Sequence, residues 1–228
     1  MKKNSKSIIC ILVIISFLSF NYNNLFNKDE TKETYTINYI PDYVGKGYIE
    51  LDNNEPNFDN VDTSTSFEEY DNLDNLDRAT KAFANIGYDL MPTEKRKSIG
   101  MIKPTGWHTV KYDLIEGKYL YNRCHLIGYQ LTGENANPNN LITCTRQMNT
   151  GVMLDYENKV AEYIRNTKNH VLYRVTPVYE NDNLLATGVI MEALSVEDNG
   201  QGIKFKIFVY NVQDGIYINY KNGDSSLL

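Results

Sequence analysis

The sequence predicts a mixed α+β domain that follows a targeting segment. Three observations predict it: apolar alternation in the C-terminal third, helical spacing of apolar residues over 149–166, and a lysine-rich start before an apolar run. The chain has 228 residues, of which 42% are hydrophobic and 23% charged. These values are close to globular averages, and they exclude a wholly disordered chain, a collagen and a polytopic membrane protein.

Residues 1–26 are predicted to be a signal peptide or an N-terminal anchor. Three lysines precede the apolar run Ile8–Phe20, which is the layout of a secretory signal. As a helix this run would reach only ~20 Å, against a hydrocarbon core of ~30 Å, so a conventional spanning helix is not expected. Because no small-residue cleavage site follows Phe20, both cleavage and a retained anchor stay open.

The remaining chain is predicted to hold a polar tether over 27–44 and one folded domain over 45–224. The tether is rich in Asn, Lys, Glu and Thr. We therefore expect a secreted protein, or one held at the extracellular face of the cell membrane. A membrane contact is expected only through the N-terminal anchor.

The first half of the domain is predicted to contain a strand, a loop and a helix. Residues 45–58 alternate and then turn, which favours a short strand, and the acidic residues 59–75 are expected to form a loop. A helix is expected over 73–86, with Gly87 as its C-cap. Its apolar positions at helical spacing are Leu73, Leu76, Ala79, Ala82, Phe83 and Ile86.

The second half is predicted to contain a hairpin, a helix and antiparallel strands. Alternation over 110–114 and 119–121 on either side of Glu116-Gly117 predicts a hairpin, and LITCTR predicts a short strand. Apolar residues over 149–166 then recur at helical spacing, which predicts a helix. The tail is expected to hold three or four strands, in HVLYRVTPVY, LLATGVIMEALS, IKFKIFVYNV and IYINY. This order of elements is typical of an α+β domain.

Cysteine usage excludes a disulfide scaffold, since the chain has three cysteines and one of them lies in the apolar run. Cys124 and Cys144 remain in the exported part. They can pair in an oxidising compartment, and two free buried thiols are the alternative.

The charge distribution is uneven. The net charge of −6 argues, taken alone, against a nucleic-acid partner. The excess of acidic over basic residues, however, comes mainly from the stretch between Glu50 and Asp77, which has no Lys or Arg. The rest of the domain is close to neutral and has room for a local basic groove, with the run 95–97 as a weaker contributor.

Among three histidines, His125 stands apart through its surroundings. It ends the predicted hairpin beside Arg123, and an Asn-rich loop and a helix follow. A neutral imidazole near the pH of use can take a proton from water. His108 and His170 are expected to be structural.

The segments YNRCHLIGYQLTG, NPNNLITCTRQMN and YENKV occur in this order. Together they resemble the DNA/RNA non-specific endonuclease family, the ββα-metal or His-Me finger nucleases. That family carries a D-R-G-H block, an N-x-x-N loop, an Asn that opens a helix and a Glu on that helix. The resemblance covers about Gly45 to Asp224. It implies a ββα-metal nuclease core on a central antiparallel sheet flanked by helices.

The resemblance implies a general base and one metal ion. His125 would be the base, and Asn149 the direct ligand of a single Mg²⁺, with Mn²⁺ able to substitute. Mg²⁺ is hard, prefers oxygen ligands and keeps several waters, which Glu157 would hold. A neutral amide ligand also leaves the full charge of the ion for the substrate.

The resemblance further implies groups that position and bind the phosphate. Asn140 would orient the site through hydrogen bonds. Arg123 and Arg146 would bind the phosphate as charge develops on it.

Spacing limits how the helix residues act together. Eight positions on a regular helix lie ~12 Å apart along the axis and differ by roughly 80°. Asn149 and Glu157 therefore cannot both bind one ion directly unless the helix start is distorted. Taken singly, Asn149 would be an N-cap, Glu157 a solvated helix residue and Arg146 an ion-pair partner. Their joint order and spacing favour the functional interpretation.

Two positions depart from the family pattern. Asn122 stands where the family has Asp, and Cys124 stands where it has Gly. The first change removes a negative charge near His125. Neither change alters the base or the expected metal ligand.

The leading hypothesis is a Mg²⁺-dependent endonuclease that cleaves DNA and RNA without sequence preference, since phosphate contacts carry no base information. One alternative is a non-catalytic nucleic-acid binding or uptake module on the same fold. Another is a surface interaction protein that uses its 18 tyrosines as an adhesive face. Most of those tyrosines alternate in predicted strands, where cross-strand packing explains them.

Overall fold

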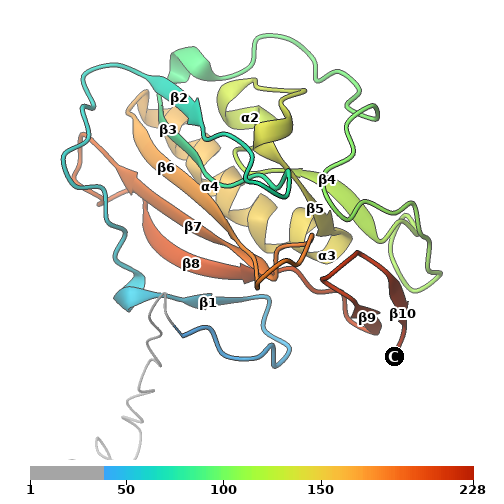
Figure 1. Cartoon of the computed structure of the whole chain (residues 1–228). Helices are drawn as coiled ribbons and strands as arrows, with labels where there is room; N and C mark the ends of the chain where they lie inside the picture. The colour runs from blue at the N-terminus through green and yellow to red at the C-terminus, as the bar shows by residue number, and fades with distance from the viewer. Residues whose placement is uncertain (1–38) are drawn as a thin grey trace, which may run out of the picture. The chain divides into compact units, whose positions relative to one another are not determined.

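A six-stranded antiparallel sheet organises residues 39–228, the part of the chain that the computed structural model describes (Figure 1). Its strand order is β1-β8-β7-β6-β3-β2. The strands are β1 Tyr48–Glu50, β2 Phe67–Tyr70, β3 Ala82–Ile86, β6 Val171–Val178, β7 Gly188–Ser195 and β8 Lys204–Tyr210.

Two smaller sheets and several helices complete the unit. β4 Tyr121–His125 pairs with β5 Leu141–Thr145, and β9 Ile216–Ile218 pairs with β10 Ser225–Leu227. The helices are α2 Tyr129–Thr132, α3 Arg146–Thr150 and α4 Val152–Thr167, with 3₁₀ turns η1 Asp52–Asn54, η2 Tyr88–Leu90 and η3 Pro138–Asn140.

The predicted signal or anchor over 1–26 and most of the tether over 27–44 lie outside the described residues. Within residues 39–228, no helix has the length and apolar character that a membrane crossing requires.

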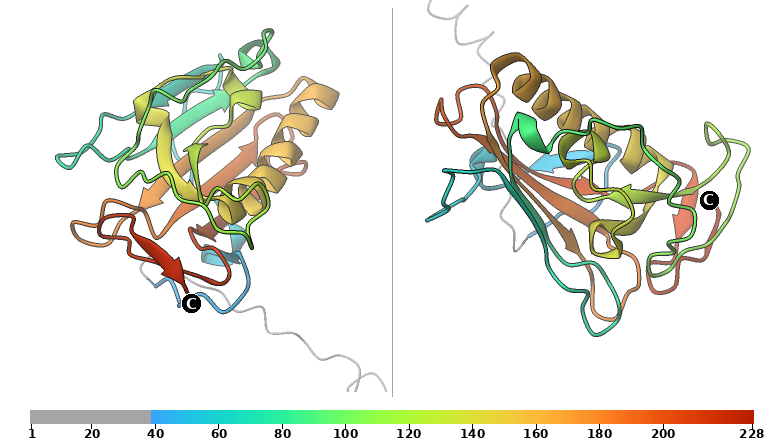
Figure 2. Two further views of the ribbon diagram at one scale, coloured as in Figure 1. Left: turned by 90° about the vertical axis from the view of Figure 1, so that its right-hand side faces the viewer. Right: turned by 90° about the horizontal axis from the view of Figure 1, so that it is seen from above.

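The main core lies between α4 and one face of the large sheet (Figure 2). Alternate strand residues face the helix because side chains on a strand point to opposite faces in turn. The buried residues that α4 contributes are Met153, Val160, Ala161 and Ile164, and those of β3 and β6 are Ala82, Ala84, Ile86, Val171, Tyr173 and Val175. This packing fixes α4, which carries Glu157, against the sheet.

A buried asparagine joins the β4–β5 pair to the large sheet. Asn211 accepts a hydrogen bond from the backbone N–H of Thr145 (2.9 Å) and donates to the carbonyls of Ala186 (2.9 Å) and Thr143 (3.3 Å). These bonds satisfy backbone groups that would otherwise be buried without partners. They hold the strand pair that delivers His125 and α3 in a fixed position.

The predicted helix over 73–86 is wrong. Residues 82–86 form β3 instead, and Gly87 precedes η2 rather than capping a helix. The apolar residues of this segment also fit a period of two, with Ala82, Ala84 and Ile86 buried in the main core. A short apolar run does not distinguish the two periods, and pairing with β2 and β6 selects the strand.

The predicted hairpin over 110–121 is present but shorter than expected. One antiparallel bridge, between Lys111 and Tyr119, joins its two arms, with backbone hydrogen bonds from Tyr112 to Lys118 (2.9 Å) and from Leu120 to Val110 (3.1 Å). Strand β4 begins at Tyr121 and takes β5 as its partner. The arms instead bury apolar side chains in a second cluster with β9: Ile115, Leu120, Tyr121, Ile216 and Ile218, joined by Trp107, Val110 and Tyr112.

Several other predictions are confirmed. β1, β5, α4 and the tail strands β6 to β9 occur where alternation or helical spacing predicts them. The expected acidic loop over 59–75 is interrupted by β2, and β10 was not predicted.

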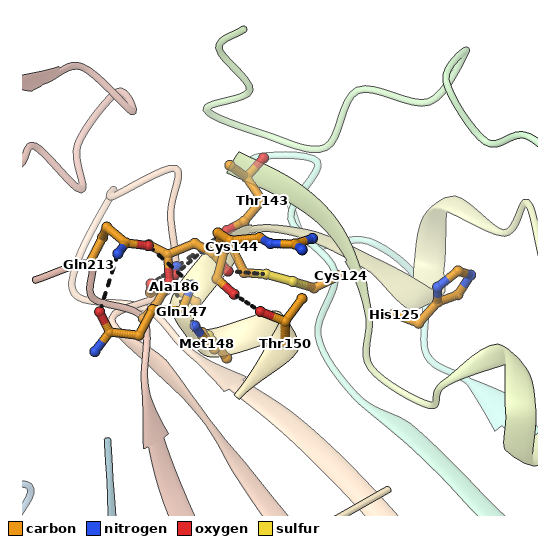
Figure 3. Close-up of a disulfide and its surroundings, with 12 residues drawn as sticks. Cys124, His125, Thr143, Cys144, Gln147, Met148, Thr150, Ala186 and Gln213 are labelled. Atoms are coloured by element: carbon orange, nitrogen blue, oxygen red, sulfur yellow. Dashed lines mark hydrogen bonds between the residues drawn. A yellow bond between two sulfur atoms is a disulfide. The ribbon is translucent and has the colours of Figure 1, made fainter. Parts of the chain in front are cut away.

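Cys124 and Cys144 form a disulfide between β4 and β5 (Figure 3). Cys124 and Cys144 are both fully buried, and their Cα atoms lie 5.9 Å apart. The pairing resolves the alternative that the sequence left open. It also explains why a cysteine stands at the family's glycine position.

The two cysteines are separated by 20 positions in the sequence, so their bond closes a loop of that length in the unfolded chain. We therefore expect the double variant Cys124→Ala/Cys144→Ala to be less stable by about 3 kcal/mol. Urea unfolding of both proteins, with and without dithiothreitol, measures the difference. Dithiothreitol should destabilise the unmodified protein and leave the double variant unchanged; equal midpoints in all four samples would contradict the prediction.

Candidate active site

A pocket of about 330 Å³ lies where the end of β4 meets α3 and α4. Its lining residues are Arg96, Arg123, His125, Gly128, Tyr129, Gln130, Asn149, Thr150, Leu154 and Glu157. Four of the six sequence-predicted site residues therefore meet in one place: Arg123, His125, Asn149 and Glu157. Asn140 and Arg146 do not line the pocket.

His125 ends β4 and exposes only 6% of its surface. Its ring points away from the neighbouring disulfide (Figure 3). Nε2 lies 2.8 Å from the backbone carbonyl oxygen of Asn135, and Nδ1 lies 3.3 Å from a terminal nitrogen of Arg96. Since a carbonyl oxygen only accepts, Nε2 must carry the proton. The neutral ring therefore has its lone pair at Nδ1.

Burial, with the nearby charge of Arg96 as a smaller cause, lowers the pKa of His125 to about 4. The hydrogen bond to Asn135 opposes this shift. The imidazole is therefore neutral at pH 7 and can accept a proton at Nδ1.

The low pKa of His125 has a consequence for acid stability. The unfolded chain takes up a proton near pH 6.5 and the folded chain only near 4, so stability is complete above 6.5 and falls as the pH drops between these values. We expect a loss of about 3 kcal/mol below pH 4 from this group. Urea unfolding at pH 7 and pH 4 should show a smaller acid loss in His125→Asn than in the unmodified protein. The matched variant His108→Asn should keep the full loss; an equal loss in all three would contradict the assignment.

Glu157 lies on α4 and exposes 9% of its surface. Burial raises the pKa of its carboxyl to about 8, while hydrogen bonds from Gln130 and the Gly128 backbone and the charge of Arg96 act in the opposite direction. The chain packs closely here, because a Cβ on Gly128 would lie 2.5 Å from Oε2 of Glu157. Only glycine at 128 allows this approach.

Asn149 and Glu157 share the pocket because the helix is broken between them. Gly151 separates α3 from α4 with φ −100° and ψ −113°, and a Cβ there would lie 2.6 Å from the carbonyl oxygen of Gln147. The break is the distortion that a common site for Asn149 and Glu157 requires. Within residues 39–228 no group of three His, Cys, Asp or Glu side chains could hold a metal ion.

Arg123 is held by the segment 100–107. Its guanidinium donates to the carbonyls of Ile102 and Gly100, the latter at 2.9 Å, and lies 3.9 Å from the ring centroid of Trp107. No carboxylate pairs with it in the described part of the chain. The guanidinium of Arg123 therefore keeps one orientation at the edge of the pocket, and no carboxylate of the described residues neutralises its charge.

Asn140 lies behind the pocket and is fully buried. Its side chain accepts from the N–H of Ile127 (2.9 Å) and donates to the carbonyl of the same residue (3.0 Å). Arg146 begins α3, and its Nε is buried with no hydrogen-bond partner in the described residues. Asn140 thus holds the turn that follows His125, whereas nothing places Arg146 at the pocket.

Sequence reasoning ranked Arg96 too low and missed the carbonyl of Asn135. The basic run Lys95 to Lys97 was the only signal for Arg96, which reaches Nδ1 of His125 from a loop. A backbone carbonyl leaves no signal in the residue types, so only the folded chain reveals it.

Comparison with known proteins identifies the family. A model described as DNA/RNA non-specific endonuclease matches residues 59–197, more than half of the chain. The chain belongs to the DNA/RNA non-specific endonuclease family. The curated deoxyribonuclease of Streptococcus dysgalactiae subsp. equisimilis is 34% identical over 110 residues, which cover 46% of this chain. The match spans only about a third of that relative's length (32%).

Solved structures of the family share the fold. NucA from Streptococcus agalactiae with magnesium bound superposes with a TM-score of 0.74 and 26% identity, covering 85% of this chain and 94% of that one. Sda1 nuclease with zinc bound gives 0.59 and 30%, covering 71% and 80%. The predicted ββα-metal nuclease fold is confirmed, with β4, β5 and the following helices as the ββα unit. The family is one of metal-dependent nucleases that act on nucleic acids.

Proposed function

We propose that this protein is an extracellular, Mg²⁺-dependent endonuclease that hydrolyses DNA and RNA without sequence preference. The observation that carries the proposal is the pocket in which a neutral imidazole, an amide oxygen, a carboxyl group and two arginines meet. Family membership supports the same class of reaction. Residues 45–224 would be the nuclease domain.

His125 would act as the general base. Its Nε2–H is held by the carbonyl of Asn135, which directs Nδ1 and its lone pair at the water to be activated. The side chain of Asn140 would position this base, since it fixes residue 127 just beyond it. In the free protein Arg96 donates to Nδ1, so a substrate phosphate must draw this guanidinium away before water can take its place.

The donor set fits a hard divalent cation. Asn149 offers a neutral amide oxygen as the direct ligand, and Glu157 would bind the waters of the ion. When bound, Mg²⁺ supplies charge that polarises the phosphoryl oxygens and favours departure of the leaving oxygen. Mn²⁺ prefers the same oxygen ligands and would substitute.

Arg123 and Arg96 would bind the scissile phosphate. Both residues line the pocket. The hydrogen bond to Gly100 and the contact with the Trp107 ring hold the guanidinium of Arg123 in one orientation. Arg146 was expected to share this role, but it does not line the pocket, and we assign the contact to Arg96 instead. Contacts with phosphate carry no information about the bases, so a site of this kind would accept both DNA and RNA without sequence preference.

The N-terminal part of the chain supports export. A signal peptide or anchor over 1–26 and a tether over 27–44 would place the domain outside the cell or at its surface. The buried disulfide agrees with an oxidising compartment.

Plasmid DNA and a structured RNA, incubated with purified residues 27–228, test the proposal. We expect both to be cut with Mg²⁺ or Mn²⁺ and neither with EDTA. Binding without cleavage at any metal concentration would instead favour the non-catalytic binding or uptake module.

A further inference from the structure

A second cavity, of about 290 Å³, lies on the face of the large sheet that points away from α4. Alternation along β8 places Ile207 and Val209 in the main core, so Phe208 and Tyr210 point to the opposite face. The segment before β1 forms another wall of the cavity. The cavity shares no residue with the candidate active site.

Four aromatic rings and two carboxylates line this cavity, and its other lining residues are aliphatic apart from one threonine. The rings and carboxylates are those of Tyr43, Phe208, Tyr210, Tyr220, Asp42 and Glu180. The ring centroids of Tyr43 and Tyr210 lie 5.5 Å apart with 63° between the planes, and those of Phe208 and Tyr210 lie 5.0 Å apart with 87°. Rings inclined in this way form adjoining walls rather than one flat surface.

The fold already uses the hydroxyls of the three tyrosines. Each donates to an acceptor of the chain: Tyr210 to the Pro41 carbonyl (2.8 Å), Tyr220 to the Asn211 carbonyl (2.7 Å) and Tyr43 to the Asp214 carboxylate (2.8 Å). The rings are therefore fixed before any ligand arrives, which lowers the cost of ordering them on binding. They offer the cavity π surface rather than hydroxyl groups.

The charge of the lining is negative, because Asp42 and Glu180 are accompanied by no Lys, Arg or His. Burial and then the charge of Asp42 raise the pKa of Tyr210, and burial and then Glu180 raise that of Tyr220 to about 12. Each carboxylate thus lies close to one of the rings. Within residues 39–228 neither carboxylate forms an ion pair or a side-chain hydrogen bond.

Other tyrosines of the domain already have a cation of the chain over their rings. Lys46 lies 4.7 Å from the ring centroid of Tyr48, and Lys111 lies 4.5 Å from that of Tyr119. In the described part of the chain, no Lys or Arg lies over any of the four rings of the cavity. The rings and the two carboxylates are therefore open to a cation from outside.

We propose that this cavity is a second binding site, which takes a small quaternary ammonium cation of the choline type. Aromatic faces attract such cations through the ring quadrupole, and the carboxylates add charge. The methyl groups of a quaternary ammonium require no hydrogen-bond acceptors, which matches rings whose hydroxyls are occupied. The volume is at the lower end of the range for ligand pockets, so a small cation fits better than a drug-sized one.

Choline binding is measured on the full chain, purified in a non-ionic detergent, by calorimetry and by thermal unfolding. Dimethylbutanol is the matched control, because it has the shape of choline without the charge. We expect one choline per chain and a melting temperature that rises with choline. Dimethylbutanol, and NaCl at the same ionic strength, should have neither effect. Neither readout depends on cleavage of nucleic acid, so the result is independent of the proposed nuclease activity.

Matched substitutions separate the ring surface from the charge. Tyr43→Leu removes one ring and should lower the affinity for choline roughly tenfold, whereas Tyr43→Phe keeps the ring and should bind nearly like the parent. Asp42→Asn and Glu180→Gln, both at exposed positions, should each lower it roughly fivefold. Asp155→Asn is the control, since this exposed carboxylate lies on α4, which packs on the other face of the sheet. It should leave choline binding unchanged.

Free choline and the headgroup of a choline lipid share this chemistry, and phosphocholine separates the two sources. Its phosphate would lie close to Asp42 and Glu180, so we expect it to bind more weakly than choline, which identifies a free cation as the ligand. Binding as tight as that of choline would identify the lipid headgroup.

Three results would overturn the proposal. Choline could give no saturable heat, or dimethylbutanol could bind as tightly as choline, which would show an apolar cavity without preference for charge. The third is a Tyr43→Leu protein and an Asp42→Asn/Glu180→Gln protein that are folded by thermal unfolding and bind choline like the parent.

Discussion

Replacing His125 with alanine is expected to lower phosphodiester cleavage by several orders of magnitude while the protein stays folded. Proton transfer by a positioned base contributes ~10²–10⁴-fold, and more is lost if the attacking water is also misplaced. In the described part of the chain, no other histidine lines the pocket. The measurement is the initial rate of plasmid cleavage at saturating Mg²⁺, with circular dichroism as the check on folding.

Two controls sharpen this experiment. His108→Ala removes an exposed imidazole that is remote from the pocket lining and should cleave like the parent. Added imidazole should restore part of the rate in His125→Ala, because the space vacated by the side chain can admit it. A His125→Ala protein that cleaves DNA at the parental rate would show that the base is a different group.

Replacing Asn149 with alanine is expected to abolish cleavage at any practical Mg²⁺ concentration. The amide oxygen is the one direct ligand that we assign, so its loss removes both the ion and the charge it supplies. Asn149→Asp should retain the ion yet cleave poorly, because the added negative charge offsets the pull of Mg²⁺ on the phosphate. Rates measured across a Mg²⁺ titration separate weak binding from slow chemistry.

Glu157→Gln provides the comparison for Asn149→Ala. The amide has nearly the same shape as the carboxylate and can still contact the waters of the ion, so a milder loss is expected. It should appear mainly as a higher Mg²⁺ requirement. Full activity of Asn149→Ala at low Mg²⁺ would refute its role as the direct ligand. If Glu157→Gln lost more activity than Asn149→Ala, Glu157 would instead be the direct ligand and Asn149 the residue that binds the waters of the ion.

The candidate site was largely predictable because its residues follow one another along the chain. His125, Asn149 and Glu157 belong to one ββα unit, so their order and spacing in the sequence carry most of the information. Arg96 comes from a loop well before this unit, and only the folded chain brings it to Nδ1 of His125. Arg146 fits the spacing equally well but does not line the pocket, since spacing cannot tell which way a side chain at a helix start points.

The fold was less predictable where short segments choose their partners. The long α4 and the alternating strands β6 to β8 carry enough apolar residues to show their period unambiguously. Residues 82–86 and 110–121 are too short for their apolar residues to show which period they follow. The first becomes a strand because β2 and β6 lie on either side of it. The second keeps only a short hairpin around the Lys111–Tyr119 bridge, and the chain then continues into β4, which pairs with β5.

The sequence by itself indicated the family and the α+β class, and it offered a candidate base and candidate metal ligands, because motif order and long periodic segments are local properties. The tertiary structure decided the rest. It broke the helix at Gly151 so that Asn149 and Glu157 share one pocket, and it assigned the proton of His125 to Nε2 through the carbonyl of Asn135. It also closed the Cys124–Cys144 bond. These are contacts between segments distant in the chain, and such contacts depend on which surfaces pack together rather than on any one stretch of residues.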